Sequence, residues 1–325
     1  MTLHRRRLIQ MAAGVAALPT LPRFGWAQVY PSRPITLVVF VPAGGAPDIS
    51  ARIVADALSQ RLGQSVLVEN RPGAGGNLAL QAVARSSTDG YTLLLIGAPH
   101  AVNVTLYGTS NLDVTRDIDP VSGLYTGTFV MVVSPSLSAK TLPEFLSYAK
   151  SSPGKINLTS TGAGNLSHLA GELFKMMTGI DVVHVPYKGA VQAHAGLLAG
   201  EVHVMFDAMT SILPQIQSGR LRALAVTTDA RSKTLRDVPT VAEYVPGYRV
   251  SSWLGIGAPK GTPREIIDRL NAELNEVLTD RVIEERFAKL SSEALLGSAS
   301  EFGKFIAAEA EKWGKVVRAT NIAPN

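Results

Sequence analysis

Short apolar runs alternate with amphipathic stretches along most of the chain, and this pattern predicts an α/β fold. Residues 35–41 are almost continuously apolar, as in a strand buried on both faces of a sheet. Residues 47–62 carry apolar side chains at helical spacing and are followed by Gly63, which suits a helix end. The alternation continues with a strand at 65–69, a helix at 77–86 and a strand at 91–96. This β-α-β-α-β order favours a parallel sheet covered by helices.

A second alternating series begins near residue 130. Its strands are predicted at 129–133, 156–160, 181–186, 202–206 and 221–227, and its helices at 142–150, 166–178, 190–199 and 211–218. A strand at 250–256 and two long helices, at about 263–290 and 301–318, complete the pattern. On the last helix, one buried stripe would be formed by Phe302, Phe305, Ile306 and Trp313.

The two series predict two lobes joined by direct crossing segments, because no flexible linker lies between them. We expect the crossings at 122–130 and 246–254 to act as hinges, with the C-terminal helices returning to the first lobe. The predicted boundaries are 28–125 plus 250–325 for the first lobe and 126–249 for the second, after a signal peptide at 1–27.

The start of the chain has the features of an export signal. Arg5, Arg6 and Arg7 form a basic start, residues 11–21 are mostly apolar and small, and Ala27 suits the last position before cleavage. The apolar stretch is too short, and too interrupted by proline, to span a bilayer. The arginines fit either a twin-arginine signal or an ordinary secretory signal, and both stay open. Either signal predicts a periplasmic protein whose mature form is not embedded in the membrane.

Charge and cysteine content exclude several classes of protein. The formal net charge is +5, but residues 1–27 carry four arginines and no acidic residue, so the mature chain is near +1. A nucleic-acid-binding surface needs a basic excess that survives maturation, and we therefore exclude nucleic acid as a partner. The absence of cysteine excludes disulfides, thiolate metal sites and cysteine nucleophiles.

Two glycine-containing loops join the end of a predicted strand to the start of a predicted helix: loop 1, residues 41–48, and loop 2, residues 160–168. Ligands of open α/β sheets bind at the carboxyl ends of strands, where helix N-termini present N–H donors and glycine lets the backbone approach closely. Two such loops facing each other across a cleft would hold an anion without a full positive charge. The candidate ligand-binding residues are Pro42, Ala43, Gly44, Gly45, Asp48, Ser160, Thr161, Gly162, Ala163, Gly164, Asn165, Ser167, His168 and Asp207.

Three of these candidates have alternative roles. Asp48 suits the first turn of a helix, as a favourable charge, better than it suits contact with an anion. His168 could donate to a ligand or help to cap the turn. Asp207 follows the strand at 202–206, so it could cap the helix that begins near Thr210 or accept a hydrogen bond from the ligand.

Sequence motifs for catalysis, cofactors and metals are missing. Residues 162–167 spell Gly-Ala-Gly-Asn-Leu-Ser, one residue short of the dinucleotide fingerprint, and no Walker A motif or G-x-S-x-G nucleophile elbow occurs. The histidines after residue 27 lack the spacing of a helical metal site. We therefore expect no cofactor, no metal and no enzymatic activity, and these absences disfavour the alternative of a periplasmic hydrolase.

Motifs spread over about residues 30–322 carry a resemblance to one family. In chain order they are Tyr-Pro-Ser-Arg-Pro-Ile (30–35), Pro-Ala-Gly-Gly (42–45), Val-Glu-Asn-Arg-Pro-Gly-Ala-Gly-Gly (68–76), Asp-Gly-Tyr-Thr-Leu (89–93), Ser-Thr-Gly-Ala-Gly (160–164), His-Val-Pro-Tyr-Lys-Gly (184–189), Phe-Asp (206–207), Gly-Arg-Leu-Arg-Ala-Leu-Ala (219–225), Val-Pro-Thr (238–240) and Gly-Thr-Pro (261–263). On these segments the chain resembles the TctC-like or Bug-type periplasmic receptors of tripartite tricarboxylate transporters.

The resemblance implies a two-lobed periplasmic-binding-protein fold of the Venus flytrap kind, in which each lobe is a sheet flanked by helices. It implies that loops 1 and 2 hold a ligand carboxylate, partly through water, and that Asp207 contacts the other end of the ligand. The family's ligands are di- and tricarboxylates, amino-dicarboxylates and aromatic carboxylates. Two integral membrane subunits are the usual partners, although many such receptors lack them, and we expect a monomer.

Two departures from the family pattern affect the expected site. Pro47 stands where Thr or Ser is common, and it removes a hydroxyl and an N–H from loop 1. Asn165 and Leu166 stand where smaller residues are frequent, which would change the size of the pocket. A second class of function also stays open, since a periplasmic sensor that presents its closed form to a membrane signalling protein would have the same sequence features.

Overall fold

The computed structural model describes residues 30–108, 112–320 and 322, and the predicted signal peptide lies outside them. The chain divides into two units, residues 1–32 and residues 33–325, and all the helices and strands described below belong to the second unit. Within the described residues, no helix combines the length and the apolarity that crossing a membrane requires.

Sheet A is built around three parallel strands in the order β2, β1, β3, which confirms the predicted β-α-β-α-β unit. Strand β9 adds to β3 in antiparallel orientation, and β4 adds to β9 and carries the short β10. The strands are β1 (Ile35–Val39), β2 (Val66–Asn70), β3 (Thr92–Gly97), β9 (Ser251–Pro259), the first part of β4 (Ile118–Val133) and β10 (Ser292–Ala294). The associated helices are α2 (Ala46–Leu62), α3 (Asn77–Ala84), α4 (Ala98–Leu106), α5 (Val114–Asp117) and the 3-10 turn η1 (Ala74–Gly76).

Sheet B contains three parallel strands in the order β7, β5, β6, and the second part of β4 pairs antiparallel with both β7 and β8. The strands besides β4 are β5 (Asn157–Ser160), β6 (Val183–Pro186), β7 (Val204–Ala208) and β8 (Arg222–Val226). The helices are α6 (Leu142–Ser151), α7 (Leu166–Thr178), α8 (Ala190–Ala199), α9 (Met209–Gln217) and the 3-10 turn η2 (Val241–Glu243). All of these strands and the four α-helices lie where the sequence predicted them, to within two residues at most ends.

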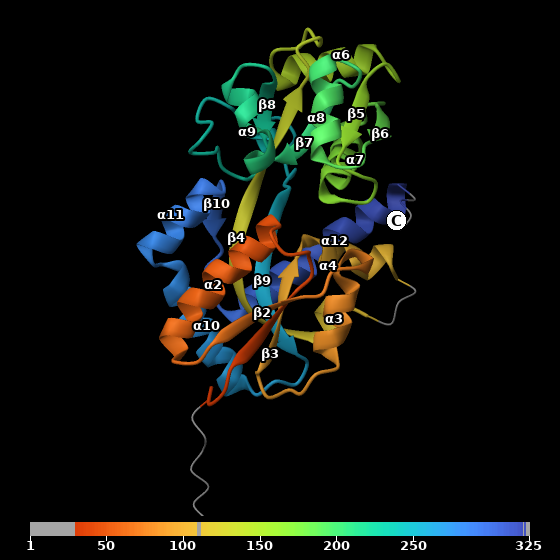
Figure 1. Ribbon diagram of the computed structural model, residues 1–325. Coiled ribbons are helices and arrows are strands. Elements are labelled where there is room, and N and C mark those ends of the chain that lie inside the picture. The colour runs from red at the N-terminus through yellow and green to blue at the C-terminus, as the bar shows by residue number, and fades with distance from the viewer. Residues whose placement is uncertain (1–29, 109–111, 321, 323–325) are drawn as a thin grey trace, which may run out of the picture. The chain divides into compact units, whose positions relative to one another are not determined.

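Strand β4 belongs to both sheets, as Figure 1 shows, and it is far longer than the predicted 129–133. It pairs with β9 up to Thr128 and with β7 from Phe129 onward, so it changes sheets inside the predicted crossing 122–130. The prediction of a strand starting at 129 was wrong because residues 118–128 show no clean alternation. Two register shifts against β9, next to Ser122 and Gly123, turn the side chains out of a simple period of two.

The predicted helix at 263–290 is also wrong, because two helices occupy it: α10 (Arg264–Leu278) and α11 (Arg281–Lys289). Between them Asp280 has extended backbone angles, and its carboxylate accepts hydrogen bonds from the amides of Val282 and Ile283. An aspartate at this position starts a new helix, and continuous apolar periodicity hid the break. The last helix is α12 (Ala299–Thr320). Its predicted stripe is confirmed at Phe302, Ile306 and Trp313, whereas Phe305 is only partly buried.

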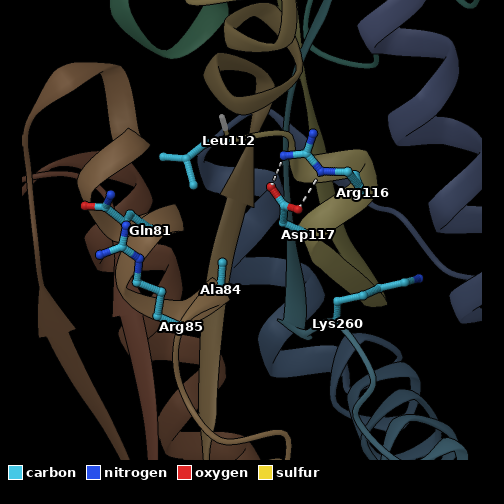
Figure 2. A pocket seen from close by; sticks show the side chains of 7 residues that line it. All are labelled: Gln81, Ala84, Arg85, Leu112, Arg116, Asp117 and Lys260. Carbon is cyan, nitrogen blue, oxygen red and sulfur yellow. Dashed lines mark hydrogen bonds and ion pairs between the residues drawn. The ribbon is translucent and has the colours of Figure 1, made fainter. Parts of the chain in front are cut away.

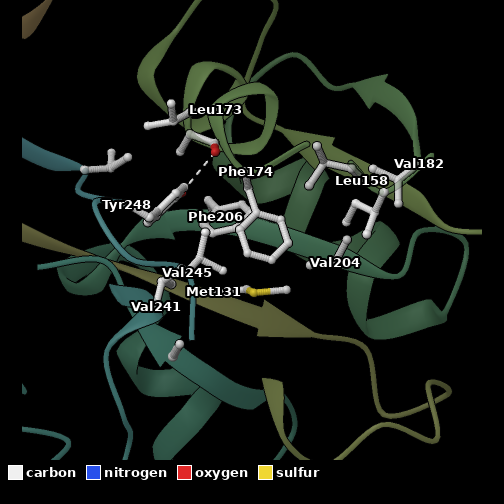
Figure 3. Packing of buried hydrophobic residues seen from close by; sticks show 14 of the residues in the cluster. Met131, Leu158, Leu173, Phe174, Val182, Val204, Phe206, Val241, Val245 and Tyr248 are labelled. Atoms are coloured by element: carbon white, nitrogen blue, oxygen red, sulfur yellow. Dashed lines mark hydrogen bonds between the residues drawn. The ribbon is translucent and has the colours of Figure 1, made fainter. Parts of the chain in front are cut away.

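Two apolar clusters cover the two faces of sheet B. Phe206 joins the cluster of Phe174 and Tyr248 shown in Figure 3, where the Tyr248 hydroxyl donates to the Ala170 carbonyl at 2.9 Å. The preceding residue of the same strand, Met205, points to the opposite face and joins a cluster with α8 and α9. Helices α7 and α8 therefore lie on opposite faces of sheet B, as the alternation of side chains along a strand requires.

Helix α12 contacts the cores of both sheets. Near its start, Phe302 packs against Trp253 of β9 in sheet A, and toward its end Trp313 joins the sheet B cluster of Figure 3. Between these contacts the Glu309 carboxylate accepts the indole N–H groups of Trp253, at 3.2 Å, and Trp313, at 2.9 Å. Lys312 pairs with the same carboxylate and donates to the Arg249 carbonyl, so the second crossing segment is tied to α12.

Candidate functional site

Strand register brings the candidate residues of sheet B to one edge. Ser160 pairs with Pro186, and Thr159 pairs with Met205, so the residues one or two positions further on lie level with each other. Thr161, Tyr187 and Asp207 are thereby placed side by side at the carboxyl edge of the parallel strands. In sheet A, Val39 pairs with Asn70 in the same way, and loop 1 follows directly.

Loop 1 is held by the carboxylate of Asp48, in the first turn of α2. One carboxylate oxygen accepts the Gly44 N–H at 2.9 Å and the Arg52 guanidinium at 3.1 Å, and the other accepts the Asn70 amide at 2.8 Å. Asn70 also donates to the Val41 carbonyl at 3.0 Å, which fixes the other end of the loop. The bond from Arg52, with help from Asn70 and Gly44, lowers the pKa of Asp48 to about 2 although burial opposes this.

The Asp48 contacts favour the helix-turn alternative over direct contact with an anion. Its side chain is 2% exposed, and both oxygens are already satisfied by donors from the protein. Arg52 and Asn70 were missed by sequence reasoning. The i, i+4 spacing of Asp48 and Arg52 on one helix could have indicated their contact. Asn70 gave no such signal, because it comes from the end of the neighbouring strand.

The backbone of loop 1 faces open space. Gly44 has φ +85°, and a β-carbon added there would meet no atom within 4 Å. Pro42, Ala43 and Gly44 are exposed, and Pro47 lies in the first turn of α2. Among the residues that the structure describes, no acceptor lies on the amides of Ala43 and Ala46. These two amides, at the N-terminus of a 17-residue helix, are the donors that loop 1 offers.

Loop 2 is held by neutral side chains. Asn165 caps α7 by accepting the His168 N–H at 3.1 Å, and its amide donates to the Thr161 hydroxyl at 2.6 Å. The Nδ1 atom of His168 accepts the Gly164 N–H at 3.0 Å. An acceptor at Nδ1 places the ring proton on Nε2, which faces Glu172 at 3.7 Å. His168 therefore fixes the turn, the second of its two predicted roles.

A second histidine lies directly behind loop 2. The ring of His184, on β6, stacks on that of His168 with centroids 3.7 Å apart, and its Nε2 bonds the Ser160 hydroxyl at 2.8 Å. Burial lowers the pKa of His184 to about 4, and the neighbouring His168 acts in the same direction. Ser160 is fully buried and also donates to the Gly162 carbonyl, so its hydroxyl supports the loop from within.

The remaining candidates divide between the loop surface and the interior. Thr161 is partly exposed, and its carbonyl accepts the Gly189 N–H at 3.1 Å, which joins loop 2 to the start of α8. Gly162, Ala163 and Gly164 are also partly exposed. Ser167 is different, because it is 3% exposed and its hydroxyl donates to the Phe206 carbonyl. It ties α7 to β7 and does not point outward.

Asp207 does not cap a helix. Its Oδ1 accepts the N–H of Ala208, and its Oδ2 lies 2.6 Å from Nε2 of His194 on α8. Helix α9 begins after Ala208 without a side-chain cap. Sequence reasoning missed His194 as a partner, because the two residues meet only when α8 crosses back over the sheet to lead into β7.

The structure gathers the candidates into two groups, one for each sheet. In the described parts of the chain, no hydrogen bond or ion pair joins loop 1 to loop 2. Residues 30–108, 112–320 and 322 contain no cluster of three or more potential metal ligands. The chemistry on offer is thus a set of neutral backbone donors in loop 1, and a glycine loop at the N-terminus of α7 with one buried Asp–His pair beside it.

A hollow of about 790 Å³ lies away from both groups, and Figure 2 shows the residues that line it: Gln81, Ala84, Arg85, Leu112, Arg116, Asp117 and Lys260. Asp117 precedes the start of β4 and Lys260 follows the end of β9, which places the hollow at the amino edge of the parallel strands. Arg116 pairs with Asp117, and Lys260 pairs with Asp119. Since ligands of such sheets bind at the carboxyl edge, the hollow is a poor candidate.

Comparison with known proteins supplies independent information. The model of a family described as the tripartite tricarboxylate transporter family receptor matches residues 50–322. Protein BugT of Bordetella pertussis is 39% identical over 297 residues, which cover 90% of this chain and 91% of BugT. Among solved structures, an R. palustris protein with adipate matches with a TM-score of 0.75 and 36% identity, covering 91% of this chain and 100% of that one.

A further structural match is the periplasmic binding protein BugD. Its TM-score is 0.72 at 32% identity, and the match covers 90% of this chain and 99% of BugD. These matches confirm the predicted fold class, an α/β periplasmic-binding-protein fold whose sheets are flanked by helices.

Proposed function

The chain belongs to the tripartite tricarboxylate transporter receptor family, and from this premise we propose that it is an extracytoplasmic receptor for a small carboxylate. The observation that carries the proposal is the pair of glycine loops at the carboxyl strand edges, each of which leads into the N-terminus of a helix. The adipate bound by the R. palustris relative supports a carboxylate ligand.

Loops 1 and 2 together form the proposed ligand site. Pro42, Ala43, Gly44 and Gly45 offer the backbone of loop 1, which Asp48 holds in shape. In loop 2 the surface residues are Thr161, Gly162, Ala163 and Gly164, while Ser160, Asn165, Ser167 and His168 support them. The ligand carboxylate would accept hydrogen bonds from the amides of Ala43 and Ala46, and Asp207 would lie near the other end of the ligand.

Two lobes that close over the ligand would bring these loops together. We take residues 28–125 plus 250–325 as the first lobe and residues 126–249 as the second, with β4 and the segment before β9 as the crossings. Helix α12 contacts both sheet cores, and the ties of Glu309 to Trp253 and Trp313 give this helix a share in the hinge.

The periplasm is the proposed location, since the basic and apolar start of the chain suits export and the relative BugD is a periplasmic binding protein. The proposed partners are the two integral membrane subunits of a tripartite tricarboxylate-type transporter, to which the closed receptor would deliver its ligand.

Thermal unfolding in a library of carboxylates tests the proposal. A ligand present at 100 times its Kd stabilises the folded protein by about 2.7 kcal/mol, which raises the Tm measurably. Gly44→Val should abolish the shift, because the side chain fills the open space at loop 1. Gly63→Val is the matched control, with φ +67°, open space around its β-carbon and a position at the other end of α2. No Tm shift with any carboxylate, or equal loss of the shift in both variants, would contradict the proposal.

A further inference from the structure

Glu309, in the middle of α12, has a buried carboxylate that bonds to two tryptophans. The residue is 6% exposed. One of its oxygens, Oε2, accepts the indole N–H of Trp253 at 3.2 Å and that of Trp313 at 2.9 Å. The other oxygen pairs with Lys312. Burying a charge costs free energy unless the charge is paired and hydrogen-bonded, and here the partners fix the positions of two indole rings.

Trp253 and α12 belong together with sheet A. Trp253 is 1% exposed on β9, and the rings of Phe302 and Phe305 pack against it with centroid distances of 6.1 and 5.2 Å. Farther along α12, a β-carbon added to Gly314 would lie only 2.8 Å from Thr105 Oγ1 on α4, so these two helices are in close contact. Trp253, α4 and α12 therefore form one packed unit with sheet A.

Trp313 makes the opposite contact, with the core of sheet B. Its ring is fully buried and joins the apolar cluster of Val245 and Tyr248, which lie in the predicted second lobe. The ammonium of Lys312 lies 4.5 Å from the centroid of the Trp313 ring and donates to the Arg249 carbonyl in the second crossing. Trp313 is thus a contact between a helix that packs with sheet A and the core of sheet B.

Both crossings between the sheets pass close to these tryptophans. Trp253 pairs with Thr126 on β4, and β4 changes sheets shortly afterwards, between Thr128 and Phe129. The second crossing leads into β9, of which Trp253 is the third residue. A rotation of lobe 2 about these crossings would leave Trp253 in place and change the packing around Trp313.

We propose that Glu309 is a positioning residue for the hinge: by holding the ring of Trp313, it fixes the surface on which lobe 2 turns and sets how readily the receptor closes. This inference rests on the proposed function, since it concerns closure over the same site. The described side-chain contacts of Glu309 include none to loop 1 or loop 2. Its effect on affinity comes from closure, because ligand binding must supply the free energy of ordering the closed form.

Intrinsic fluorescence tests the inference directly. The chain has three tryptophans, and Trp26 lies in the predicted signal peptide, so the mature chain keeps only the two that bond to Glu309. Adipate, present in the structure of the R. palustris relative, is the first probe. The library carboxylate with the largest Tm shift replaces adipate if adipate gives no shift. Binding should change the emission of the mature protein with a midpoint equal to the Kd from calorimetry.

Two single variants assign the emission change to one ring. Trp253→Phe should retain the change, because Trp313 lies at the contact that moves. Trp313→Phe should lose the change, because Trp253 stays within sheet A. Calorimetry on both variants shows whether each still binds the carboxylate.

Glu309→Gln tests the effect on affinity. The amide is uncharged and has only one acceptor oxygen, so it holds Trp313 less firmly, and the Kd should rise about tenfold. Glu311→Gln is the control, an exposed carboxylate on the same helix that pairs with Lys315, and it should leave the Kd unchanged. Phe145→Leu, in the buried core beneath α6, should lower the Tm without changing the Kd, which separates lost stability from a role in the hinge.

The outcomes distinguish the inference from the proposed function. Carboxylate binding without an emission change, a change carried by Trp253 alone, or an unchanged or lower Kd in Glu309→Gln overturns the hinge role and leaves the receptor proposal standing. The two tryptophan variants decide the question if Glu309→Gln fails to fold. A mature protein that binds no carboxylate overturns both.

Discussion

Loops 1 and 2 occupy equivalent places at the carboxyl edges of their sheets, yet different chemistry holds them. Loop 1 depends on one ionised carboxylate, Asp48, which collects donors from Gly44, Arg52 and Asn70. Loop 2 depends on neutral groups, with Asn165 and the stacked His168 and His184 behind it. Both arrangements hold a glycine loop at the N-terminus of a helix, so one loop is supported by a charged group and the other by uncharged hydrogen-bonding groups.

The difference predicts different responses to acid. Asp48 has a pKa of about 2, below its ordinary value of 3.8, so its stabilisation of loop 1 is complete above pH 3.8 and is lost only as the pH falls toward 2. His184 has a pKa of about 4, below its ordinary value of 6.5. The unfolded chain therefore binds more protons between these values, and stability falls as the pH decreases from 6.5 toward 4. Loop 2 is the acid-sensitive support.

The largest expected effect comes from adding a side chain to a glycine of loop 2, as Gly44→Val does in loop 1. Gly164 has φ +75°, and Gly164→Val should weaken carboxylate binding by about a hundredfold or more, because a β-branched side chain strains the turn that shapes loop 2. Gly179→Val is the matched control, with φ +68° and open space at the C-terminal end of α7. Calorimetric Kd values that change equally in the two variants would remove loop 2 from the site.

Removing the charge that supports loop 1 should have the next largest effect. Asp48→Asn keeps the shape of the side chain but loses the ion pair and leaves a buried donor poorly satisfied, which costs about 1–3 kcal/mol of unfolding free energy in urea at pH 7. Asp56→Asn, an exposed position on the same helix, should change stability little. An Asp48→Asn protein as stable as the control would mean that the carboxylate does not hold the loop.

The acid response of loop 2 can be tested with His184→Gln. Gln retains an amide that reaches the Ser160 hydroxyl but does not titrate, so unfolding free energy should decline less steeply between pH 6.5 and pH 4 than in the wild type. Some slope should remain, because burial also lowers the pKa of His100, in helix α4, to about 4. Unfolding curves at several pH values measure the slope, and identical slopes in both proteins would contradict the assignment.

The smallest expected effect concerns Ser167, whose buried hydroxyl joins α7 to β7. Ser167→Ala should lower stability by about 1 kcal/mol, the usual contribution of a single hydrogen bond. Ser151→Ala removes an exposed bond of the same kind, to the Tyr148 carbonyl, and should cost less. Thermal unfolding compares the two variants. An equal loss of stability in both would show that burial of the hydrogen bond between α7 and β7 does not increase its contribution.

Most of the elements could be predicted from the sequence because they obey local rules. Helices α7 and α8 have the predicted bounds, since apolar periodicity and a following glycine mark both ends. Local rules did not predict an element whose conformation depends on the strands that pair with it. Strand β4 stays extended through two register shifts because β9 and β7 form hydrogen bonds with its backbone amides and carbonyls. No pattern within residues 118–128 indicates this pairing.

The candidate site was predicted as far as loops and residue types could reveal it. Glycines after a strand and before a helix predicted loops 1 and 2, and the first-turn role of Asp48 followed from its position. The sequence could not divide the candidates into surface and support. Ser160, Ser167 and His168 all belong to loop 2, yet their side chains bond to groups of the protein, and only the packing of α7 against β6 and β7 shows this.

Hydrophobic period, turn chemistry and motif order are properties of neighbouring residues, so the alternation of strands and helices, the two glycine loops and the family could all be predicted from the chain alone. Which side chains form hydrogen bonds and ion pairs with each other depends on how the elements pack. Asn70 reaches Asp48 because β2 lies beside β1, and His194 reaches Asp207 because α8 crosses over the sheet. Hydrogen bonds act over about 3 Å, and residues distant in the chain come that close only through the fold.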